Sequence, residues 1–166
     1  MIQLSEHEKA ILVKSIGTPG DQMAMELVVD AARILGAKHL IPIESSHIDG
    51  CLYHGDSGVL YCEKLAAYGT QVKVPTTTNV GALNLTNFNQ TNLSKVKRDM
   101  AYRLMLAHQK MGCLPTWTCA PYQAGARPSY GQQVAWGESN AVAFTNSILG
   151  ARTNRYGDFL DIACAI

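Results

Sequence analysis

Trp136-Gly-Glu-Ser-Asn-Ala-Val-Ala-Phe-Thr-Asn-Ser-Ile-Leu-Gly-Ala-Arg-Thr-Asn-Arg155 joins a polar cluster, an apolar run and two arginines in one short stretch. Its middle predicts a helix, because apolar residues recur on one face: Val142, Phe144, Ile148 and Leu149. Polar residues before that face are placed to cap the helix N-terminus: Glu138, Ser139 and Asn140. Gly150 is placed to end the helix in a left-handed turn.

The residues after this helix are suited to binding a carboxylate. Arg152, Asn154 and Arg155 follow Gly150 directly. A guanidinium group is planar and can grip both oxygens of a carboxylate, so we expect a receptor for an acidic small molecule here. The alternative is that both arginines pair with acids on the protein surface, and spacing alone does not separate the two.

Length and composition indicate one α/β domain. The chain has 166 residues, of which 47% are hydrophobic, and its mean hydropathy is −0.01, so it can bury a core. A net charge of +1 favours neither nucleic acid nor an anionic membrane as partner, which leaves a small molecule or another protein. No run approaches the roughly 18 apolar residues of a membrane span, and no signal peptide opens the chain. We therefore expect a cytoplasmic protein.

Working outward from the opening stretch, helical patterns alternate with short apolar runs. Helices are predicted at 5–17, 21–35, 57–68, 94–111 and within 157–166. Strands are predicted at 40–43, 72–74, 114–119 and 133–136, with an irregular connection at 82–92. This alternation predicts a mostly parallel sheet flanked by helices. Because the chain stops on apolar residues, we expect it to be an incomplete domain from a longer polypeptide.

Polar loops follow the predicted strands, where ligands bind in parallel sheets. His47 and Asp49 are candidates for acid–base or ligand roles, although such residues also form turns and helix caps. The threonines at 76–78 offer hydroxyl groups to a carboxylate or phosphate, or are β-branched strand residues. The chain has no G-x-G-x-x-G, P-loop or G-x-S-x-G motif, so nucleotide binding and serine hydrolysis have no support.

Cysteine spacing argues against disulfides and against a zinc knuckle. The five cysteines show no C-x-x-C pair and are Cys51, Cys62, Cys113, Cys119 and Cys164. Cys119 lies at a predicted strand end and precedes Pro121, so it is the best-placed thiol for a metal or iron–sulfur cluster. One cysteine cannot hold a cluster alone, and the alternative is a buried structural thiol.

Four ordered motifs together resemble the N-terminal part of aconitase X over nearly the whole chain. They are Ser-Ser-His-Ile-Asp-Gly at 45–50, Lys-Leu-Ala-Ala-Tyr-Gly with Val-Pro-Thr-Thr-Thr-Asn within 64–79, Thr-Cys-Ala-Pro-Tyr at 118–122, and the stretch at 136–155. The resemblance implies an aconitase-like α/β/α fold in the catalytic large subunit, a chain continuing beyond residue 166, and a small swivelling domain or subunit. It also implies a hydro-lyase that removes water from a hydroxylated acid with iron.

The resemblance implies roles for individual residues as well. Cys119 resembles the first ligand of a 2Fe–2S or 4Fe–4S cluster, or of a mononuclear iron, with the partner cysteines outside this chain. The implied proton-abstracting serine lies on the small domain. The implied substrate cleft is lined by Ser46, His47, Thr76, Thr77, Thr78, Tyr122, Glu138, Ser139, Asn140, Arg152, Asn154 and Arg155.

The chemistry agrees with this assignment. Dehydration next to a carboxylate needs a Lewis acid on the leaving hydroxyl, a base, and fixed cations that stabilise the developing enediolate. We expect iron on Cys119 to be the Lewis acid and the arginines to be the cations. The segment 47–53 is closer to bacterial relatives than to archaeal ones, so cis-3-hydroxy-L-proline dehydratase is the expected activity. The alternatives are the large subunit of phosphomevalonate dehydratase and a non-catalytic domain that binds a carboxylate or a protein.

Overall fold

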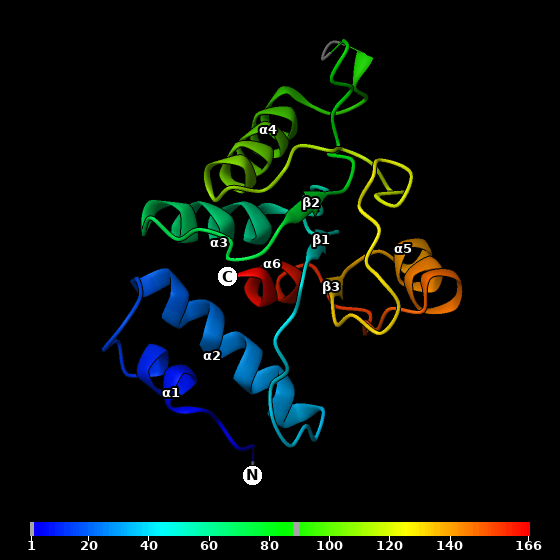
Figure 1. The fold of residues 1–166 in the computed structure, drawn as a ribbon. Coiled ribbons are helices and arrows are strands. Elements are labelled where there is room, and N and C mark those ends of the chain that lie inside the picture. Colours follow the sequence, from blue (N-terminus) through cyan, green and yellow to red (C-terminus); the bar gives the residue numbers. More distant parts are fainter. Residues whose placement is uncertain (1, 88–89) are drawn as a thin grey trace.

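A computed structural model describes residues 2–87 and 90–166, so two residues of the predicted irregular connection, 88 and 89, lie outside it. Its centre is a parallel sheet with the strand order β2-β1-β3 (Figure 1). The strands are β1 (Ser46–Ile48), β2 (Thr76–Thr78) and β3 (Ala135–Trp136). The structure confirms the predicted α/β class with a parallel sheet.

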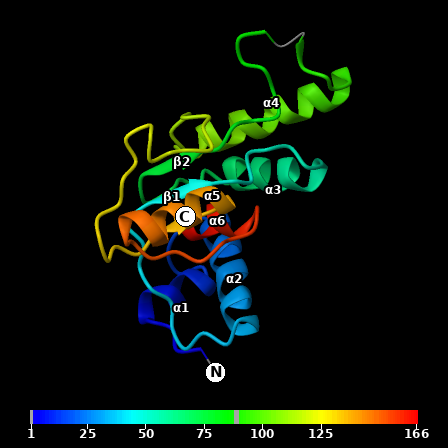
Figure 2. The same ribbon diagram turned by 90° about the vertical axis from the view of Figure 1, so that its right-hand side faces the viewer.

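Helices cover both faces of this sheet (Figures 1 and 2). One side carries α3 (Asp56–Ala67) and α4 (Lys95–Lys110), which pack against each other. The other side carries α6 (Leu160–Ala165), α2 (Pro19–Ile34) and α1 (Glu6–Leu12). Helix α6 contacts β1 and β3 directly, and α2 packs against α6. This layering is the predicted α/β/α arrangement.

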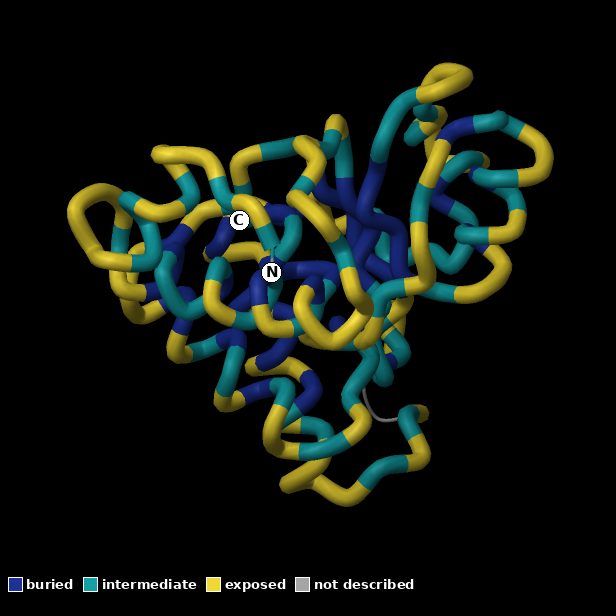
Figure 3. Tube along the Cα trace, turned by 90° about the horizontal axis from the view of Figure 1, so that it is seen from below, coloured by how far each residue is buried: buried dark blue, intermediate teal, exposed yellow. Residues whose placement is uncertain are grey.

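The main core lies between β1 and the helices α3, α4 and α6. Its largest buried apolar side chains are Ile48, Val59, Leu65, Leu104, Met111 and Ile162. Figure 3 shows the buried segments running through the interior of the molecule. Each such side chain contributes about 1.5–3 kcal/mol when it leaves water, so this cluster holds α3 and the carboxyl-terminal half of α4 over the sheet.

His108 is the polar exception within that core. It is fully buried, its Nδ1 lies 2.9 Å from the Leu104 carbonyl oxygen, and its Nε2 lies 3.6 Å from the Cys62 sulfur. Burial lowers the pKa of His108 to about 4, so the ring is neutral near pH 7. Both ring nitrogens therefore have a partner, as buried polar atoms normally do.

The helix starts follow the predicted signals closely. The capping box of Ser5 and Glu8 is present at α1. A second capping box, formed by Thr18 and Asp21, starts α2 at Pro19, two residues before the predicted start. The first helix is shorter than predicted and ends at Leu12. In the part of the chain that the structure describes, no helix has the length and apolar character needed to cross a membrane.

The first two strands lie further along the chain than predicted. Segments 40–43 and 72–74 are not strands, and the strands are formed by the polar residues that follow them. Pro42 has no backbone N–H to give to a ladder. Lys73 donates its N–H to the Ala165 carbonyl rather than to a strand. The prediction was wrong because it assigned the strands to apolar runs, whereas β1 and β2 consist mainly of polar residues that are buried on both faces of the sheet.

The last two predicted strands are shorter than expected. Of 114–119, only Leu114 forms a bridge, which pairs it with Thr77. Of 133–136, the last two residues form β3, and Gln133 forms a bridge with Arg152. These bridges extend the parallel pattern at both edges of the sheet.

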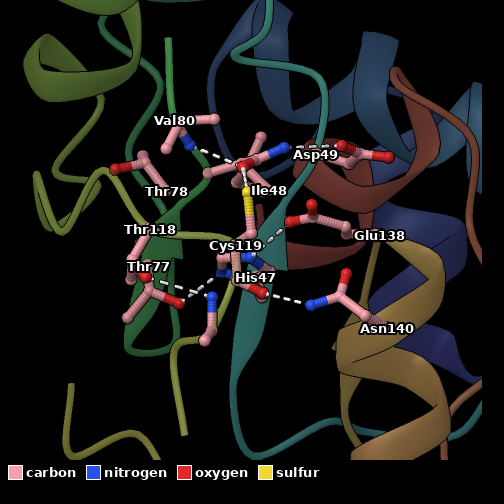
Figure 4. A network of polar contacts seen from close by, with 12 residues as sticks. His47, Ile48, Asp49, Thr77, Thr78, Val80, Thr118, Cys119, Glu138 and Asn140 are labelled. Atoms are coloured by element: carbon pink, nitrogen blue, oxygen red, sulfur yellow. Dashed lines mark hydrogen bonds and ion pairs between the residues drawn. The ribbon is translucent and has the colours of Figure 1, made fainter. Parts of the chain in front are cut away.

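The opening stretch of the sequence folds largely as predicted. It forms α5 (Ser139–Phe144), which continues as a π-helix (Thr145–Leu149). Gly150 then adopts the predicted left-handed conformation, with φ of 69°. Glu138, one of the predicted capping residues, is the N-cap residue of α5, but its side chain makes no capping hydrogen bond because it turns toward the sheet (Figure 4).

Candidate functional site

Polar side chains from separate segments meet at the carboxyl end of β1 and β2 (Figure 4). His47 lies on β1 and Thr77 pairs with it on β2. Cys119 comes from the connection before β3, and Glu138 and Asn140 come from the start of α5. The structure therefore brings these predicted site residues together where parallel sheets bind ligands.

His47 is buried with one ring nitrogen unsatisfied. Its side chain has 0% exposure, and Nδ1 lies 2.8 Å from the Thr77 hydroxyl oxygen. Nε2 has no hydrogen-bond partner in residues 2–87 and 90–166, and it faces the Glu138 Oε2 atom at 3.6 Å. That carboxylate oxygen is also buried and unpartnered. Unsatisfied buried polar atoms are costly, so a pair of them facing each other marks a site that a ligand or proton completes.

The protonation of this pair follows from burial. Burial lowers the pKa of His47 to about 4, against the opposing charge of Asp49, so the ring is neutral near pH 7. Burial also raises the pKa of the Glu138 carboxyl. When the Thr77 hydroxyl donates to the Ser46 carbonyl, 3.4 Å away, it accepts the Nδ1 proton and leaves a lone pair on Nε2. The pair is then able to hold or release a single proton.

Cys119 presents a partly buried thiol beside this pair. Its Sγ donates to the Asn79 Oδ1 atom at 3.2 Å, and the thiol also interacts with Glu138. Burial raises the pKa of this thiol, and the negative charge of Glu138 raises it further. Asn140 donates its amide to the Cys119 carbonyl oxygen at 2.7 Å, which holds the backbone of the thiol in place.

A second polar chain adjoins the thiol through Asn79. Its Nδ2 donates to the Asp49 carboxylate at 2.7 Å, and Arg155 Nη2 lies 3.9 Å from the other oxygen of Asp49. Arg155 is 56% exposed, so it is held at the rim with its guanidinium open to solvent. Of the two predicted arginines, this is the one that reaches the site.

The loop after β1 is fastened by a carboxylate inside a helix. Asp161 lies in α6, is fully buried, and accepts the backbone N–H groups of Asp49 at 2.7 Å and of Gly50 at 3.1 Å. Burial raises the pKa of Asp161 to about 7, although these N–H groups favour its charged form. The N-cap residue of α6 is Phe159, and the Asp161 side chain reaches the loop after β1 instead of capping its own helix.

Backbone geometry around Glu138 is tight and strained. A Cβ atom on Gly137 would lie 2.7 Å from the Asp49 Cβ, so only glycine allows this close approach. Glu138 has φ of 39°, which side chains with a Cβ rarely adopt, and Trp117, close to Cys119, has φ of 44°. Such strain is typical of functional sites.

Three predicted site residues serve the sheet itself. Ser46 donates its hydroxyl to the Ala135 carbonyl at 2.7 Å. Thr76 donates to the Val74 carbonyl at 2.8 Å, and Thr78 donates to the Leu114 carbonyl at 2.9 Å. Each hydroxyl therefore satisfies a backbone acceptor, and of the threonine run only Thr77 contacts the acid–base pair.

Two more predicted residues flank the site without entering its polar network. The Tyr122 ring stacks on Phe144, with ring centroids 3.8 Å apart and an interplanar angle of 7°. Tyr122 thereby packs against the small apolar cluster around Trp136. Ser139 is exposed at the first turn of α5.

Arg152 and Asn154 depart from the predicted convergence. Both line a large cavity whose described wall includes neither Cys119 nor His47. Arg152 Nη1 donates to the Gly150 and Ala151 carbonyl oxygens. The backbone of Arg152 forms a bridge with Gln133, whereas Arg155 lies near Asp49, so the two arginines do not share one site although they are close in sequence.

Two residues of the network were missed from the sequence. Asn79 directly follows the threonine run, and its position at a strand end was the signal that pointed to it. Asp161 lies between apolar residues, and an aspartate in such a run is seldom buried unless it has partners. Its partners lie in the loop after β1, more than 100 residues earlier in the chain, so the sequence pattern did not reveal them.

The donor atoms fit one side of an iron site. Cys119 supplies a thiol, and the unpartnered His47 Nε2 and Glu138 Oε2 lie in the same network. In the described ranges, no three such residues are arranged to hold a metal ion by themselves. The remaining ligands of any iron at Cys119 would come from outside this chain.

Comparison with known proteins shows which family the chain resembles over its whole length. The family model described as "Aconitase X first domain" matches residues 1–166. The cis-3-hydroxy-L-proline dehydratases of Pseudomonas aeruginosa and Hypocrea jecorina are 39% and 41% identical over 99% of this chain, which covers 28% of each relative. The phosphomevalonate dehydratase large subunit of Thermococcus kodakarensis is 37% identical over 98% of this chain, which covers 40% of it.

A solved structure shows the same fold. The holo-form of aconitase X from Thermococcus kodakaraensis superposes with a TM-score of 0.88 and 36% identity, over 99% of this chain and 41% of the other. The chain spans less than half the length of these relatives. The match across all 166 residues confirms the resemblance, and the chain belongs to the aconitase X family.

Proposed function

We propose that residues 1–166 form the N-terminal portion of the catalytic domain of an aconitase X large subunit. In the complete enzyme this domain removes water from a hydroxylated carboxylic acid. The observation that carries the proposal is the unpartnered pair of His47 Nε2 and Glu138 Oε2, 3.6 Å apart and next to the Cys119 thiol. The curated relatives of this chain are named as dehydratases, which supports the hydro-lyase class.

The preferred substrate is cis-3-hydroxy-L-proline. Two relatives with that name align with 99% of this chain at 39% and 41% identity, which supports this choice. The alternative is phosphomevalonate, supported by large subunits such as that of Methanothermobacter thermautotrophicus, 39% identical over 87% of the chain. Both substrates carry a carboxylate beside the reacting carbons, and Arg155 at the rim offers a guanidinium for it.

Cys119 holds iron in this proposal, either as a 2Fe–2S or 4Fe–4S cluster or as a mononuclear ion. Bound iron supplies the Lewis acid for the leaving hydroxyl. The pair of His47 and Glu138 holds a proton beside it, since the ring is neutral and the pKa of the carboxyl is raised by burial. Asn140 and Asn79 hold the backbone and the sulfur of Cys119 in position.

The complete enzyme needs parts that this chain does not contain. We assign the proton-abstracting serine and the closing of the cleft to a small swivelling domain or subunit. The other iron ligands belong to the rest of the large subunit. All five cysteines are free thiols, which suits a reducing compartment, and we place the enzyme in the cytoplasm.

The test uses a complete enzyme. This chain is joined to the rest of the Pseudomonas aeruginosa dehydratase, loaded with iron without oxygen, and assayed for water loss from cis-3-hydroxy-L-proline. A parallel preparation uses the rest of the Thermococcus kodakarensis large subunit with its small subunit, and is assayed with phosphomevalonate. We expect turnover of hydroxyproline, and we expect Cys119→Ser to lose both iron and activity.

Cys164→Ser is the matched control, because Cys164 is also partly exposed but lies on α6. It should keep iron and activity. If neither substrate reacts and Cys119→Ser keeps the iron content of the parent, the hydro-lyase proposal is wrong. A domain that binds a carboxylate without catalysis then becomes the better explanation.

A further inference from the structure

A large cavity lies on the α2 side of the molecule, away from the polar network of Cys119. Its volume is about 1210 Å³, and α2, the segment 37–43 and residues near the end of the chain line it. Its apolar lining includes Ile11, Val28, Leu35, Ile41, Ile43 and Ile166. We call it the α2 cavity. Neither Cys119, His47 nor Glu138 lines it.

The lining exposes large apolar side chains to solvent. Leu35 is 70% exposed, Ile41 is 56% exposed and Ile16 is 39% exposed. Leaving apolar surface in water costs about 25 cal/mol per Å², so folded monomers rarely keep such patches unless a partner covers them. The α2 cavity therefore has the character of an interface.

One wall of the α2 cavity is an extended segment with unused backbone groups. Residues 40–43 have the composition of a strand, and Figure 1 shows this segment rising from the end of α2 toward β1. Within the described ranges, no backbone hydrogen bond joins 40–43 to another segment. The first bond after it is from the Glu44 N–H to the Gln133 carbonyl. An extended segment with free N–H and C=O groups is a template for pairing with another strand.

The wrong strand prediction at 40–43 has a physical explanation in this context. Its residues favour a strand, but in the part of the chain that the structure describes only the preceding residue, His39, forms a bridge, which pairs it with Gln3. Residues 40–43 themselves have no backbone partner there. Pro42 restricts pairing to an edge, so a single added segment would satisfy the free groups. The missing partner must then come from a different polypeptide segment.

Relatives of this chain are much longer than 166 residues. The chain covers 28% of the Pseudomonas aeruginosa relative and 41% of the solved Thermococcus structure, so more than half of each lies outside the aligned part. We propose that the α2 cavity is the docking surface for the part of the aconitase X large subunit that this chain does not span. An apolar segment of that part fills the cavity and pairs with residues 40–43.

The first experiment measures docking directly. The tagged 166-residue chain is co-expressed with the part of the Pseudomonas aeruginosa relative that this chain does not align with, and the captured amount of that part is measured. We expect capture by the parent chain. Ile41→Glu should lower it at least about tenfold, because a carboxylate would be buried against apolar surface without a partner. Leu35→Glu should lower it similarly.

Leu60→Glu is the matched control. Leu60 is 59% exposed, close to the value for Ile41, but it lies on α3 outside the cavity lining. It should be captured as well as the parent. Because Leu35 and Ile41 are exposed in this chain, their variants should keep the circular dichroism spectrum of the parent. Equal capture of Ile41→Glu and Leu60→Glu would overturn the proposal.

A second experiment does not depend on separate folding of the partner. Hydrogen exchange of the Ile41 and Ile43 amides is measured in the chain alone and in a continuous polypeptide with the remainder of the relative. Exchange in the continuous polypeptide should be at least ~100-fold slower, because the amides become paired. Equal exchange rates would overturn the proposal. So would dimers of the chain alone that Ile41→Glu dissociates, since the occupant would then be a second copy.

Neither readout requires iron or substrate. A failure of docking therefore leaves the hydro-lyase proposal untouched, and an inactive enzyme leaves the docking result untouched.

Discussion

Two buried histidines, one in the core and one in the candidate site, differ in how completely their ring nitrogens are hydrogen-bonded. His47 on β1 and His108 on α4 are both fully buried, and burial lowers the pKa of each to about 4. His108 has a partner for both ring nitrogens. His47 has one for Nδ1 only, and its Nε2 faces the unpartnered Glu138 oxygen at 3.6 Å.

The difference separates a structural residue from a candidate for chemistry. A satisfied buried histidine adds packing and hydrogen bonds to the core. A buried histidine with an unsatisfied ring nitrogen loses its hydrogen bonds to water and gains none from the protein. Its presence therefore points to a ligand or a transferred proton. A mutation of His47 should therefore lower activity, and a mutation of His108 should lower stability.

The largest expected effect is on activity, at His47. In the completed enzyme, His47→Gln should lower kcat about 10²–10⁴-fold, because the amide cannot exchange a proton with Glu138. The free energy of urea unfolding should change by less than about 1 kcal/mol, because the amide replaces the bond to Thr77. Steady-state kinetics and urea titration measure the two. If His47→Gln left kcat unchanged, His47 would have no role in catalysis and would not differ from the structural residue His108.

The next effect is on stability, at His108. His108→Ala should lower the free energy of unfolding by about 3 kcal/mol, because it leaves a cavity between α3 and α4 and removes the partner of the Leu104 carbonyl. The kcat of the folded enzyme should stay at the parent value. Chemical denaturation checks the first expectation. A stable but inactive variant would show that the core histidine also takes part in catalysis.

A third, smaller effect is on the pH dependence of stability. His108 has a folded pKa of about 4, below its ordinary 6.5, so the unfolded chain binds more protons between these values and stability rises with pH. Asp161 has a folded pKa of about 7, above its ordinary 3.8, so its contribution falls with pH over the same window.

Asp161→Asn removes the titrating carboxyl group, and with it the contribution to the unfolding free energy that decreases as the pH rises. Between pH 4.5 and 6.5, the unfolding free energy of this variant should rise more steeply than that of the parent, by ~1.4 kcal/mol per pH unit. Urea titrations at several pH values measure both slopes. Parallel slopes would mean that Asp161 is ionised throughout this range in the folded protein.

The smallest expected effect comes from the partner of His47. Thr77→Val removes the hydroxyl bonded to Nδ1, which should lower kcat about tenfold by releasing the ring orientation. Thr78→Val is its matched control: it loses a bond to the Leu114 carbonyl, so it should cost about 1 kcal/mol of stability and leave kcat unchanged. If both variants lose activity equally, the sheet rather than the histidine is responsible.

Prediction from sequence worked best where the signals are local. Helix α4 begins directly after Ser94, the first residue of the predicted helix, which accepts the Lys97 N–H, and Gly150 ends the π-helix as expected. Both depend on residues a few positions apart. Strand positions were missed because β1 and β2 are polar in sequence but buried on both faces in the structure. Strand identity depended on distant partners that hydropathy does not reveal.

The candidate site was predictable in part. Motifs around His47, Cys119 and Glu138 indicated the segments that meet, and the structure brings these three together. Arg152 was assigned to the same cleft because it is close to Arg155 in sequence, yet it lines the α2 cavity. Arg155 instead lies 3.9 Å from Asp49, so two arginines three residues apart do not share a pocket.

By itself, the sequence determined the helices, the α/β class and the family, since caps, apolar periodicity and ordered motifs are properties of contiguous residues. Only the tertiary structure decided which polar groups are satisfied. His108 and His47 look alike in sequence, and their difference arises because α3 and α4 supply two partners to one ring, while Thr77 supplies one to the other and leaves Nε2 against Glu138. Hydrogen-bond satisfaction depends on segments far apart in the chain, and folding is what brings them within reach.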